Sequence, residues 1–453
     1  MKKFIALLLF VSFVFVSCSN DSSNPVVSVD SEAPSAVTDL SVGFTSGNSA
    51  TLFLTATGDD GIFGRAKTYE VRYATSMIDS ANYALATQFL PPNQPNVGTA
   101  DDTIIVTGLL PNTKYYFAVK LADETPNWSP ISNIDSATTL LSGSWTVYRT
   151  DNSDLPSNEV LAIQLDGVVK YISTLDGVST YNNTTWNLIY DAQEIRIDTT
   201  IIVSDTTIDT TFFGTVNSIA IESSSQIWFG TNSNGVALLE GDSTVFYKSN
   251  DSGISILSLT DILISDNKLW IGTLTSGLYS FALDGSNAWQ KYDVPITLHG
   301  LGKINCIEAT ANNEIWTGLQ VYGASVLGNS VFTNYSSDNN FTNQGVWDIS
   351  VSGTKTLFGT DAGAFLFEND IWTNYMAVDS GLPDNVVTAV VIDNQGTYWF
   401  GTRFGLASFN GTVWTNYTTV NSYLPDNFIN TLQVDMFGNL WIGTKNGLAR
   451  FSN

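Results

Sequence analysis

The sequence of 453 residues predicts an all-β protein built from repeated small sheets, and the repeat itself is the main observation. A unit of 42 residues that starts at Trp372 starts again at Trp414, and looser copies extend back to Trp145. Each copy consists of short β-branched and aromatic runs between turns, which is typical of strands. Because such a unit cannot bury its apolar faces alone, we expect the copies to pack in a ring, as a β-propeller.

Seven copies are recognised from the W-x-x-Y stretch that begins each predicted outer strand. These stretches start at Trp145, Trp186, Thr244, Trp289, Phe332, Trp372 and Trp414, with steps of 41, 58, 45, 43, 40 and 42 residues. Each blade should contain an inner strand, a WFGT-type strand, a GLxxF-type strand and the outer strand. We therefore predict a seven-bladed propeller over residues 141–453, in which residues 145–148 complete the last sheet and hide two sheet edges.

The predicted inner strands carry mostly small or short side chains at their third position, as expected where blades converge on an axis. These residues are Ala162, Ser218, Asp261, Cys306, Asp348, Ala389 and Thr431. Asp261, Asp348 and Glu308 are acidic exceptions among the inner-strand positions as a whole, and they either bind a cation or water near the axis or form hydrogen bonds in a wet channel. Trp347 stands one residue into its inner strand and is expected to roof the channel.

Ten of the 12 Trp residues fall in this repeat, and we interpret them as packing between blades rather than as an aromatic ligand cage. The glycine of each WFGT-type strand is expected to let neighbouring backbones approach closely. The tetrads that begin at Asp393 and Asp435 have Asp first and Gly last, which predicts hairpin turns.

Residues 1–17 have the features of a secretion signal, with two lysines before an apolar run that is too short to span a bilayer. Cys18 follows a small residue, which resembles the lipobox of bacterial lipoproteins, although Phe15 stands where Leu is usual. The resemblance implies a lipid anchor at Cys18. Ser19 stands where an Asp can retain lipoproteins at the inner membrane in some bacteria, which favours the outer membrane or cell surface and leaves the leaflet open. Ordinary cleavage with secretion and an uncleaved anchor are the alternatives. The composition of residues 18–32, which is rich in Ser, Asn, Asp and Val and poor in aromatic residues, predicts a tether.

The composition is strongly acidic, with 18 Lys and Arg against 43 Asp and Glu and a net charge of −25. This charge argues against nucleic acid as a partner and against binding to anionic lipid headgroups through charge. If Cys18 carries lipid, Cys306 is the only other thiol. We therefore expect no disulfide and a fold that depends on packing.

Residues 33–140 differ in composition and predict a separate β-sandwich of short strands. The alternation from Leu109 through Tyr115, followed by Trp128, resembles a fibronectin type III domain over its whole length. The resemblance implies that Tyr115 forms a tyrosine corner, whereas Leu54 stands where that family usually has a core Trp. We expect this domain to act as a spacer or, alternatively, as a binding module.

The composite of LPDN, the inner strand, W-x-G-T, G-L-x-x-F and W-x-x-Y resembles the two-component regulator propeller repeat. The resemblance covers residues 145–453 and is most specific in the last two blades. It implies the fold and a tendency to bind extracellular ligands, often carbohydrates, and it implies no catalytic residue. Relatives include periplasmic sensors of hybrid histidine kinases. Because no kinase follows Phe451 in this chain, a signalling role is expected to need a partner protein.

The loops before the inner strands and those between the second and third strands are expected on one face of the ring, the default binding face. The predicted ligand-binding residues there and at the channel are Asp176, His299, Tyr322, Phe341, Trp347, Asp361, Arg403, Phe404, Tyr423 and Lys445. Such mixed aromatic and charged tips suit sugar or peptide recognition, and ordinary solvated loop ends are the alternative. An insertion at residues 191–213 predicts a hairpin, either a flap or docking arm beside this face or a purely exposed hairpin.

We predict no enzymatic activity, no cofactor and no metal site. His299 is the single His, and the sequence lacks HExxH, GxSxG and phosphate-loop motifs. The repeat distantly resembles streptogramin B lyase, which implies a His base with a bound metal, yet no second base or ligand is evident near His299. The expected function is an extracytoplasmic recognition module for a glycan, peptide or protein. A structural or adhesive surface protein and a propeller lyase are the alternatives.

Overall fold

The computed structural model describes residues 30–91, 93–141, 143–192, 196–199, 208–211, 214–241, 243–247, 258–293, 303–335 and 345–452. Cys18, the predicted signal and most of the tether lie outside these ranges. The described residues form 37 strands and one short 3-10 helix, Tyr83–Leu85, which confirms the all-β prediction. No helix among them is long and apolar enough to cross a bilayer. They divide into two compact units, built mainly from residues 30–137 and 138–452.

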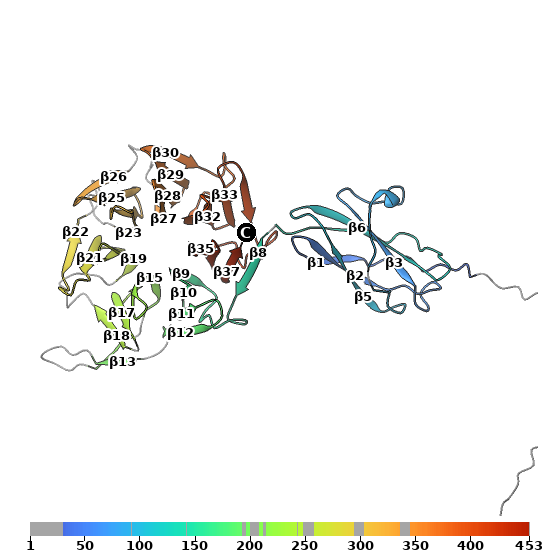
Figure 1. Cartoon of the computed structure of the whole chain (residues 1–453), viewed down its shortest axis with the longest axis horizontal. Helices are drawn as coiled ribbons and strands as arrows, with labels where there is room; N and C mark the ends of the chain where they lie inside the picture. Colours follow the sequence, from blue (N-terminus) through green and yellow to red (C-terminus); the bar gives the residue numbers. More distant parts are fainter. Residues whose placement is uncertain are drawn as a thin grey trace, which may run out of the picture. The chain divides into compact units, whose positions relative to one another are not determined.

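The first unit contains two sheets (Figure 1). Its strands are β1 (Ser41–Thr45), β2 (Ser49–Thr55), β3 (Thr68–Ala74), β4 (Thr87–Phe89), β5 (Asp101–Thr107), β6 (Lys114–Ala122) and β7 (Asp135–Thr138). One sheet has the order β1-β2-β5 and the other the order β4-β3-β6-β7. Leu52, Val71 and Phe117 belong to the core, and Leu54 is also buried. Leu54, the residue at which the fibronectin type III resemblance leads one to expect Trp, is therefore a core residue.

The described residues of the second unit form seven four-stranded antiparallel sheets, which we call blades, with strands A to D from the inside outward. Blade 1 is β9 (Val160–Asp166), β10 (Val169–Thr174), β11 (Gly177–Tyr181) and β12 (Trp186–Asp191); blade 2 is β15 (Val216–Ser223), β16 (Gln226–Thr231), β17 (Val236–Glu240) and β18 (Ser243–Tyr247). Blade 3 is β19 (Leu259–Ser265), β20 (Lys268–Thr273), β21 (Leu278–Ala282) and β22 (Trp289–Tyr292); blade 4 is β23 (Ile304–Ala309), β24 (Ile315–Leu319), β25 (Ala324–Gly328) and β26 (Val331–Tyr335).

The remaining blades follow the same strand order. Blade 5 is β27 (Val346–Ser352), β28 (Lys355–Thr360), β29 (Gly363–Glu368) and β30 (Ile371–Tyr375); blade 6 is β31 (Val387–Ile392), β32 (Tyr398–Thr402), β33 (Leu406–Phe409) and β34 (Trp414–Tyr417). Blade 7 is β35 (Ile429–Val434), β36 (Leu440–Thr444) and β37 (Gly447–Ser452), completed by β8 (Ser144–Tyr148). The insertion after blade 1 pairs β13 (Arg196–Thr199) with β14 (Ile208–Thr211), so the predicted hairpin is present.

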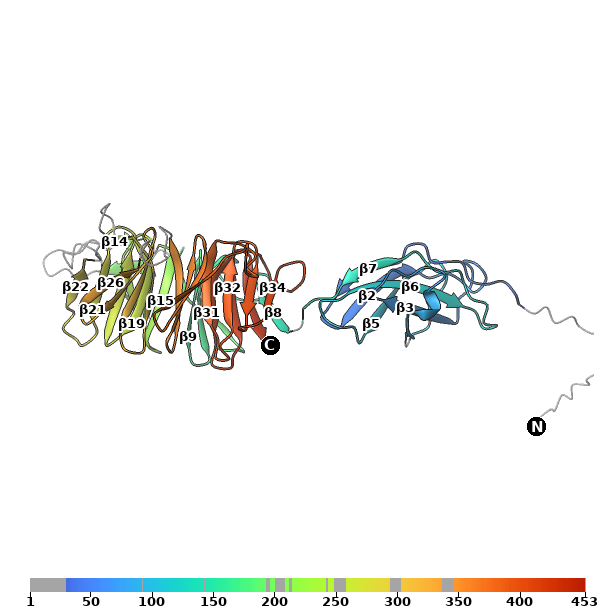
Figure 2. The ribbon, with the colours of Figure 1, turned by 90° about the horizontal axis from the view of Figure 1, so that it is seen from above.

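The A strands form a closed ring, as Figure 1 shows. They line a central channel. Each A strand contacts the A strands of both neighbouring blades, and β35 of blade 7 contacts β9 of blade 1. Figure 2 shows this unit edge-on, with its strands running between two faces. The observed order of inner, WFGT-type, GLxxF-type and outer strands is the predicted one.

Glycines in the B strands let adjacent blades approach closely, as predicted. A Cβ atom on Gly401 of β32 would lie 2.5 Å from Cγ2 of Ile429 in blade 7. A Cβ atom on Gly443 of β36 would lie 2.7 Å from Cγ1 of Val160 in blade 1. Both distances are well below van der Waals contact, so a larger residue at either position would push the blades apart.

Tryptophan side chains pack between blades, in agreement with their interpretation from the sequence. The ring of Trp399 in blade 6 lies 5.6 Å from that of Phe451 in blade 7. Trp145, on β8 of blade 7, lies 5.7 Å from Tyr417 of blade 6. The indole N–H of Trp399 donates to the carboxylate of Asp393 at 2.9 Å. The first residue of the predicted hairpin turn therefore also orients a tryptophan.

Strand β8 closes the ring by pairing with β37 of blade 7. The pairing is antiparallel, with Tyr148 opposite Leu448 and Trp145 opposite Phe451. Residues that precede blade 1 in the chain thus form the outer strand of the last blade. The predicted closure by residues 145–148 is confirmed, and β37 has strand partners on both sides.

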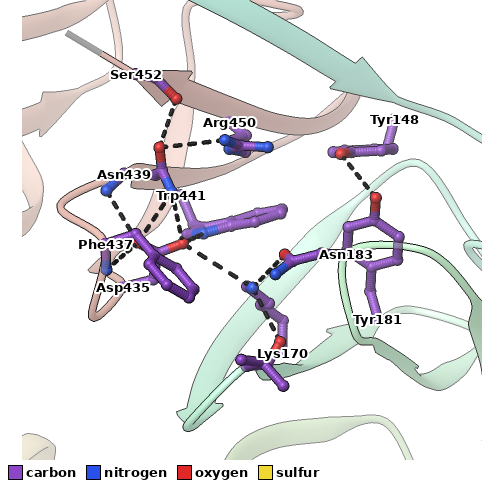
Figure 3. A network of polar contacts seen from close by, with 11 residues as sticks. Tyr148, Lys170, Tyr181, Asn183, Asp435, Phe437, Asn439, Trp441, Arg450 and Ser452 are labelled. Carbon is purple, nitrogen blue, oxygen red and sulfur yellow. Dashed lines mark hydrogen bonds and ion pairs between the residues drawn. The ribbon is translucent and has the colours of Figure 1, made fainter.

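A buried ion pair lies at the seam between blades 7 and 1 (Figure 3). The Nζ of Lys170 on β10 lies 3.9 Å from Oδ2 of Asp435, and both side chains are at most 1% exposed. Burial lowers the pKa of Lys170. The pKa of Asp435 lies below its ordinary value. Burial acts to raise this pKa, but hydrogen bonds from Trp441 and Asn439 outweigh that effect. The other blades have uncharged residues at the position of Lys170, namely Ile227, Leu269, Ile315, Thr356, Tyr398 and Leu440.

Candidate functional site

In the described part of the chain, the DA loops, which join a D strand to the next A strand, and the BC loops, which join the B and C strands of a blade, lie on one face of the ring, as predicted. Backbone hydrogen bonds connect the two sets of loops. The N–H of Asp361 in the BC loop of blade 5 donates to the carbonyl of Gly345 at 3.1 Å. The N–H of Lys445 in the BC loop of blade 7 donates to the carbonyl of Phe428 at 3.3 Å. We call this surface the loop face.

Three DA loops share one internal structure. In loop 418–428, the N–H of Thr418 donates to Oδ1 of Asn421 at 2.7 Å, and that of Thr419 donates to Oδ1 of Asn427 at 2.9 Å. The same two bonds recur through Asn152 and Asn158 in loop 149–159 and through Asp379 and Asn385 in loop 376–386. Such side-chain bonds to turn backbone fix the loops, so their outer side chains project from defined positions.

The central channel has a volume of about 540 Å³. It is lined by the A strands of all seven blades. Side chains at the second A-strand position connect neighbouring blades. Asn217, Asn305, Thr388 and Asn430 donate to the carbonyls of Leu259, Val346, Ile429 and Val160, respectively. Hydrogen bonds between blades therefore hold the wall of the channel.

Trp347 occupies the same strand position in blade 5 and makes a different contact. Its side chain is 36% exposed, and it lines the channel. Its indole N–H donates to Oδ1 of Asp361 at 2.6 Å, and Oδ2 of Asp361 accepts the N–H of Gly345 at 3.1 Å. The structure thus brings together two predicted site residues, an aromatic ring at the channel and the carboxylate that fixes its orientation.

The three predicted acidic residues line the channel, and two of them connect blades. Asp261 accepts hydrogen bonds from the hydroxyl of Ser218 at 2.6 Å and from the N–H of Ile307 at 2.8 Å. Asp348 accepts the N–H of Val390 at 2.8 Å. The hydrogen bonds that the sequence interpretation expected are therefore present at these two aspartates. Among the described residues, no group of three or more His, Cys, Asp or Glu is placed to hold a metal ion.

The charge of these carboxyl groups is unbalanced within the channel. Burial raises the pKa of Asp261 to about 6 and that of Asp348 to about 7. Burial, together with the charges of both aspartates, raises the pKa of Glu308 to about 8. Among the described residues that line the channel, there is no Lys, Arg or His. Because these residues supply no compensating cation, the three groups take up protons more readily than in water.

The other predicted site residues are separate from this cluster. Arg403, Phe404, Tyr423 and Lys445 are exposed in loops of blades 6 and 7. Tyr322 packs partly buried against the core between blades 3 and 4 and has a positive φ of 85°. Asp176 lies in the BC loop of blade 1, and its carbonyl accepts the N–H of Ala192 at 2.9 Å. His299 and Phe341 lie outside the described residues.

Sequence reasoning missed three residues of the loop face, namely Val378, Val420 and Arg149. Val420 is 86% exposed in loop 418–428, and Val378 is 85% exposed at the equivalent position of loop 376–386. Arg149 is held by its guanidinium, which donates to the carbonyls of Asn446 and Pro425. The repeated loop sequence was the available signal, because it aligns both valines at one position.

Two segments match the family described as two component regulator propeller, at residues 381–404 and 423–446. They extend from the DA loop through the B strand in blades 6 and 7, where the sequence resemblance is most specific. Each segment also reaches the BC loop that contains Arg403 or Lys445. No curated protein matches the chain in sequence.

Solved structures show the propeller fold. Streptogramin B lyase is 13% identical, with 68% of this chain and 97% of the lyase covered and a TM-score of 0.51. PorZ, a bacterial surface component of the type-IX secretion system of Porphyromonas gingivalis, is 14% identical, with 91% and 62% covered and a TM-score of 0.51. The extracellular domain of a putative hybrid two component system from B. thetaiotaomicron is 16% identical, with 68% and 52% covered and a TM-score of 0.37. This chain therefore spans about half the length of that domain.

Proposed function

We propose that this protein is an extracytoplasmic recognition module whose propeller binds a glycan, peptide or protein ligand on the loop face. The observation that carries the proposal is Trp347, an exposed aromatic ring held at the channel by Asp361. Because the ring is already oriented, the protein loses less side-chain entropy when a ligand stacks on it. An apolar ring beside convergent polar groups is the usual composition of a binding site.

The proposal includes the domain organisation expected from the sequence. A lipid anchor at Cys18 and a tether hold a fibronectin type III sandwich and a seven-bladed propeller outside the cytoplasm. Support for the sandwich comes from its two sheets of three and four strands, and support for the blade count comes from the seven four-stranded sheets. Support for the propeller family comes from the two segments matched in blades 6 and 7.

An unbiased array of glycans and peptides, probed with the purified protein, tests this function. For any ligand found, we expect Trp347→Ala to weaken binding about thirtyfold, the loss typical of an aromatic anchor. We expect Asp361→Asn to weaken binding less, because the ring remains but loses its charged acceptor. Trp128→Ala is a matched control, since Trp128 is 42% exposed in the other unit.

Two results would contradict the proposal. Unchanged affinity of Trp347→Ala for every ligand found would place the site elsewhere on the ring. Absence of any ligand on the array would favour the alternative of a structural or adhesive surface protein. The lyase alternative is supported by the shared propeller fold alone, and conversion of a streptogramin B substrate by the purified protein would be the result in its favour.

A further inference from the structure

A second surface of the loop face combines positive charge with exposed apolar side chains. It consists of Arg403 and Phe404 in the BC loop of blade 6, Val420 in DA loop 418–428, and Lys445 in the BC loop of blade 7. We call it the basic patch. Loop 418–428 connects its parts, because Thr418 lies beside Gly405 and Phe428 bonds to Lys445.

Comparison of the seven BC loops shows that the charge is local. The BC loops of blades 6 and 7 contain Arg403 and Lys445, whereas the other five contain no Lys or Arg. The BC loops of blades 1 and 5 contain Asp176 and Asp361 instead. Two neighbouring blades thus carry cations at the same loop in a chain of net charge −25. Since the blades repeat one fold, this difference is not required by the architecture.

No carboxylate forms an ion pair with these cations within the described part of the chain. The ion pairs found there include neither Arg403 nor Lys445. The Nζ of Lys445 lies 4.0 Å from the ring centroid of Phe428, a contact that leaves its charge uncompensated. The carboxylate of Asp426, in the same DA loop, instead accepts the N–H of Phe428 at 2.8 Å.

Arg149 adds a third positive charge at the border of the patch with blade 1. Its guanidinium donates to two carbonyls, those of Asn446 and Pro425, and it forms no ion pair among the described residues. Asp151 and Asp154, farther along the loop of Arg149, limit the positive surface on that side. The basic patch therefore has a defined extent over blades 6 and 7.

The apolar members of the patch favour a peptide over a sugar. Phe404 is 64% exposed and Val420 is 86% exposed. A sugar ring stacks on aromatic faces but gains little from an isolated aliphatic side chain, whereas apolar side chains of a peptide pack against both. Arg and aromatic residues are also the residue types that dominate protein–protein binding energy.

We propose that the basic patch docks an acidic segment of a partner protein, in which Asp or Glu residues alternate with apolar residues. The carboxylates pair with Arg403 and Lys445, and the apolar side chains pack on Phe404 and Val420. Charge complementarity carries this assignment, because the patch is a local positive surface on a strongly acidic molecule. The surface does not include Trp347 or the channel, so it is independent of the ligand site proposed above.

The test measures binding of the whole protein to a fluorescein-labelled peptide of about eight residues in which Glu alternates with Val, Phe or Leu. The double variant Arg403→Glu, Lys445→Glu should weaken binding about thirtyfold or more, as expected for two lost anchors. Lys291→Glu is the matched control, because Lys291 lies on β22 and is paired with Asp293 at 3.5 Å. Raising the salt concentration should weaken wild-type binding, since exposed charges are screened.

Three results would overturn the proposal. The first is no binding of the acidic peptide at about 1 mM, and the second is equal binding by wild type and double variant. The third is binding of hyaluronan oligosaccharides, but not the peptide, with loss of that binding in the double variant, which would assign the patch to an acidic glycan. The variant Trp347→Ala should bind the acidic peptide normally, so failure of the channel site and failure of the patch are distinguished.

Discussion

We expect the stability of this protein to depend on pH through three carboxyl groups in the channel. Asp261, Asp348 and Glu308 have ordinary pKa values of 3.8, 3.8 and 4.5, and in the fold these rise to about 6, 7 and 8. The folded state therefore binds protons more readily than the unfolded state. Stability contributed by this difference is fully present below the ordinary values and is lost as pH rises toward the folded values.

We expect the melting temperature to fall between about pH 5 and pH 8.5, by roughly 5 °C or more for a unit of this size. Glu308→Gln should flatten this dependence and raise the melting temperature at the alkaline end, because Gln has no proton to lose. Asp293→Asn is the control, since the side chain of Asp293 is 93% exposed. Thermal unfolding across this pH range measures the effect, and an unchanged slope in Glu308→Gln would contradict it.

The seam ion pair gives a second prediction at the residue scale. Asp435→Asn leaves the ammonium group of Lys170 buried with no carboxylate, which typically costs about 3 kcal/mol of unfolding free energy or more. The double variant Lys170→Met, Asp435→Asn should recover much of this loss, because Met resembles the uncharged residues of the other blades. Urea denaturation of the two single variants and the double variant measures the coupling. Additive losses would show that the two groups do not interact.

At the scale of elements, strand β8 decides whether blade 7 has an open edge. Replacing residues 144–148 by a Gly-Ser sequence of equal length removes the pairing of Trp145 with Phe451 and exposes β37. We expect a lower melting temperature and concentration-dependent self-association, because an unpaired edge strand pairs with other chains. Calorimetry and light scattering measure both effects. A monomeric variant with wild-type stability would show that β8 is dispensable.

The repeated loops and strands explain which elements were predictable. A glycine such as Gly401 and a tryptophan such as Trp399 recur at fixed steps, so periodicity alone identifies their strands. The contact of Trp347 with Asp361 does not recur. It needs an aromatic residue at one A-strand position and a carboxylate 14 residues later in the same blade, and no periodic pattern marks such a pair.

At the scale of the whole molecule, the predicted order of the strands around the ring was correct. The ion pair at the seam between blades 7 and 1 was not predicted. Lys170 and Asp435 are separated by most of the propeller sequence, and their contact exists because the first and last blades meet. Sequence spacing predicts that the ring closes but does not show which side chains meet when it does. The same reason applies to the basic patch, whose Arg403 and Lys445 become neighbours only because blades 6 and 7 are adjacent.

Anchoring is a property of the whole chain and gives a further prediction. If Cys18 carries lipid, Cys18→Ser should release the protein from membranes or stop its processing, because the remaining apolar run is too short to span a bilayer. Partition of wild type and variant between detergent and aqueous phases measures this directly. Equal membrane association of both proteins would refute lipid anchoring at this residue.

The pairing of β8 with β37 also sets an order of events during folding. Strand β8 is made before blade 1, but its partner β37 follows blades 1 to 6 in the sequence, so those blades must be synthesised before the two strands can meet. Contacts between such distant segments make folding slow. A permuted chain that carries residues 143–158 after residue 452 would build each blade from one continuous segment. Its refolding should be faster than that of the natural order, although both reach the same closed ring.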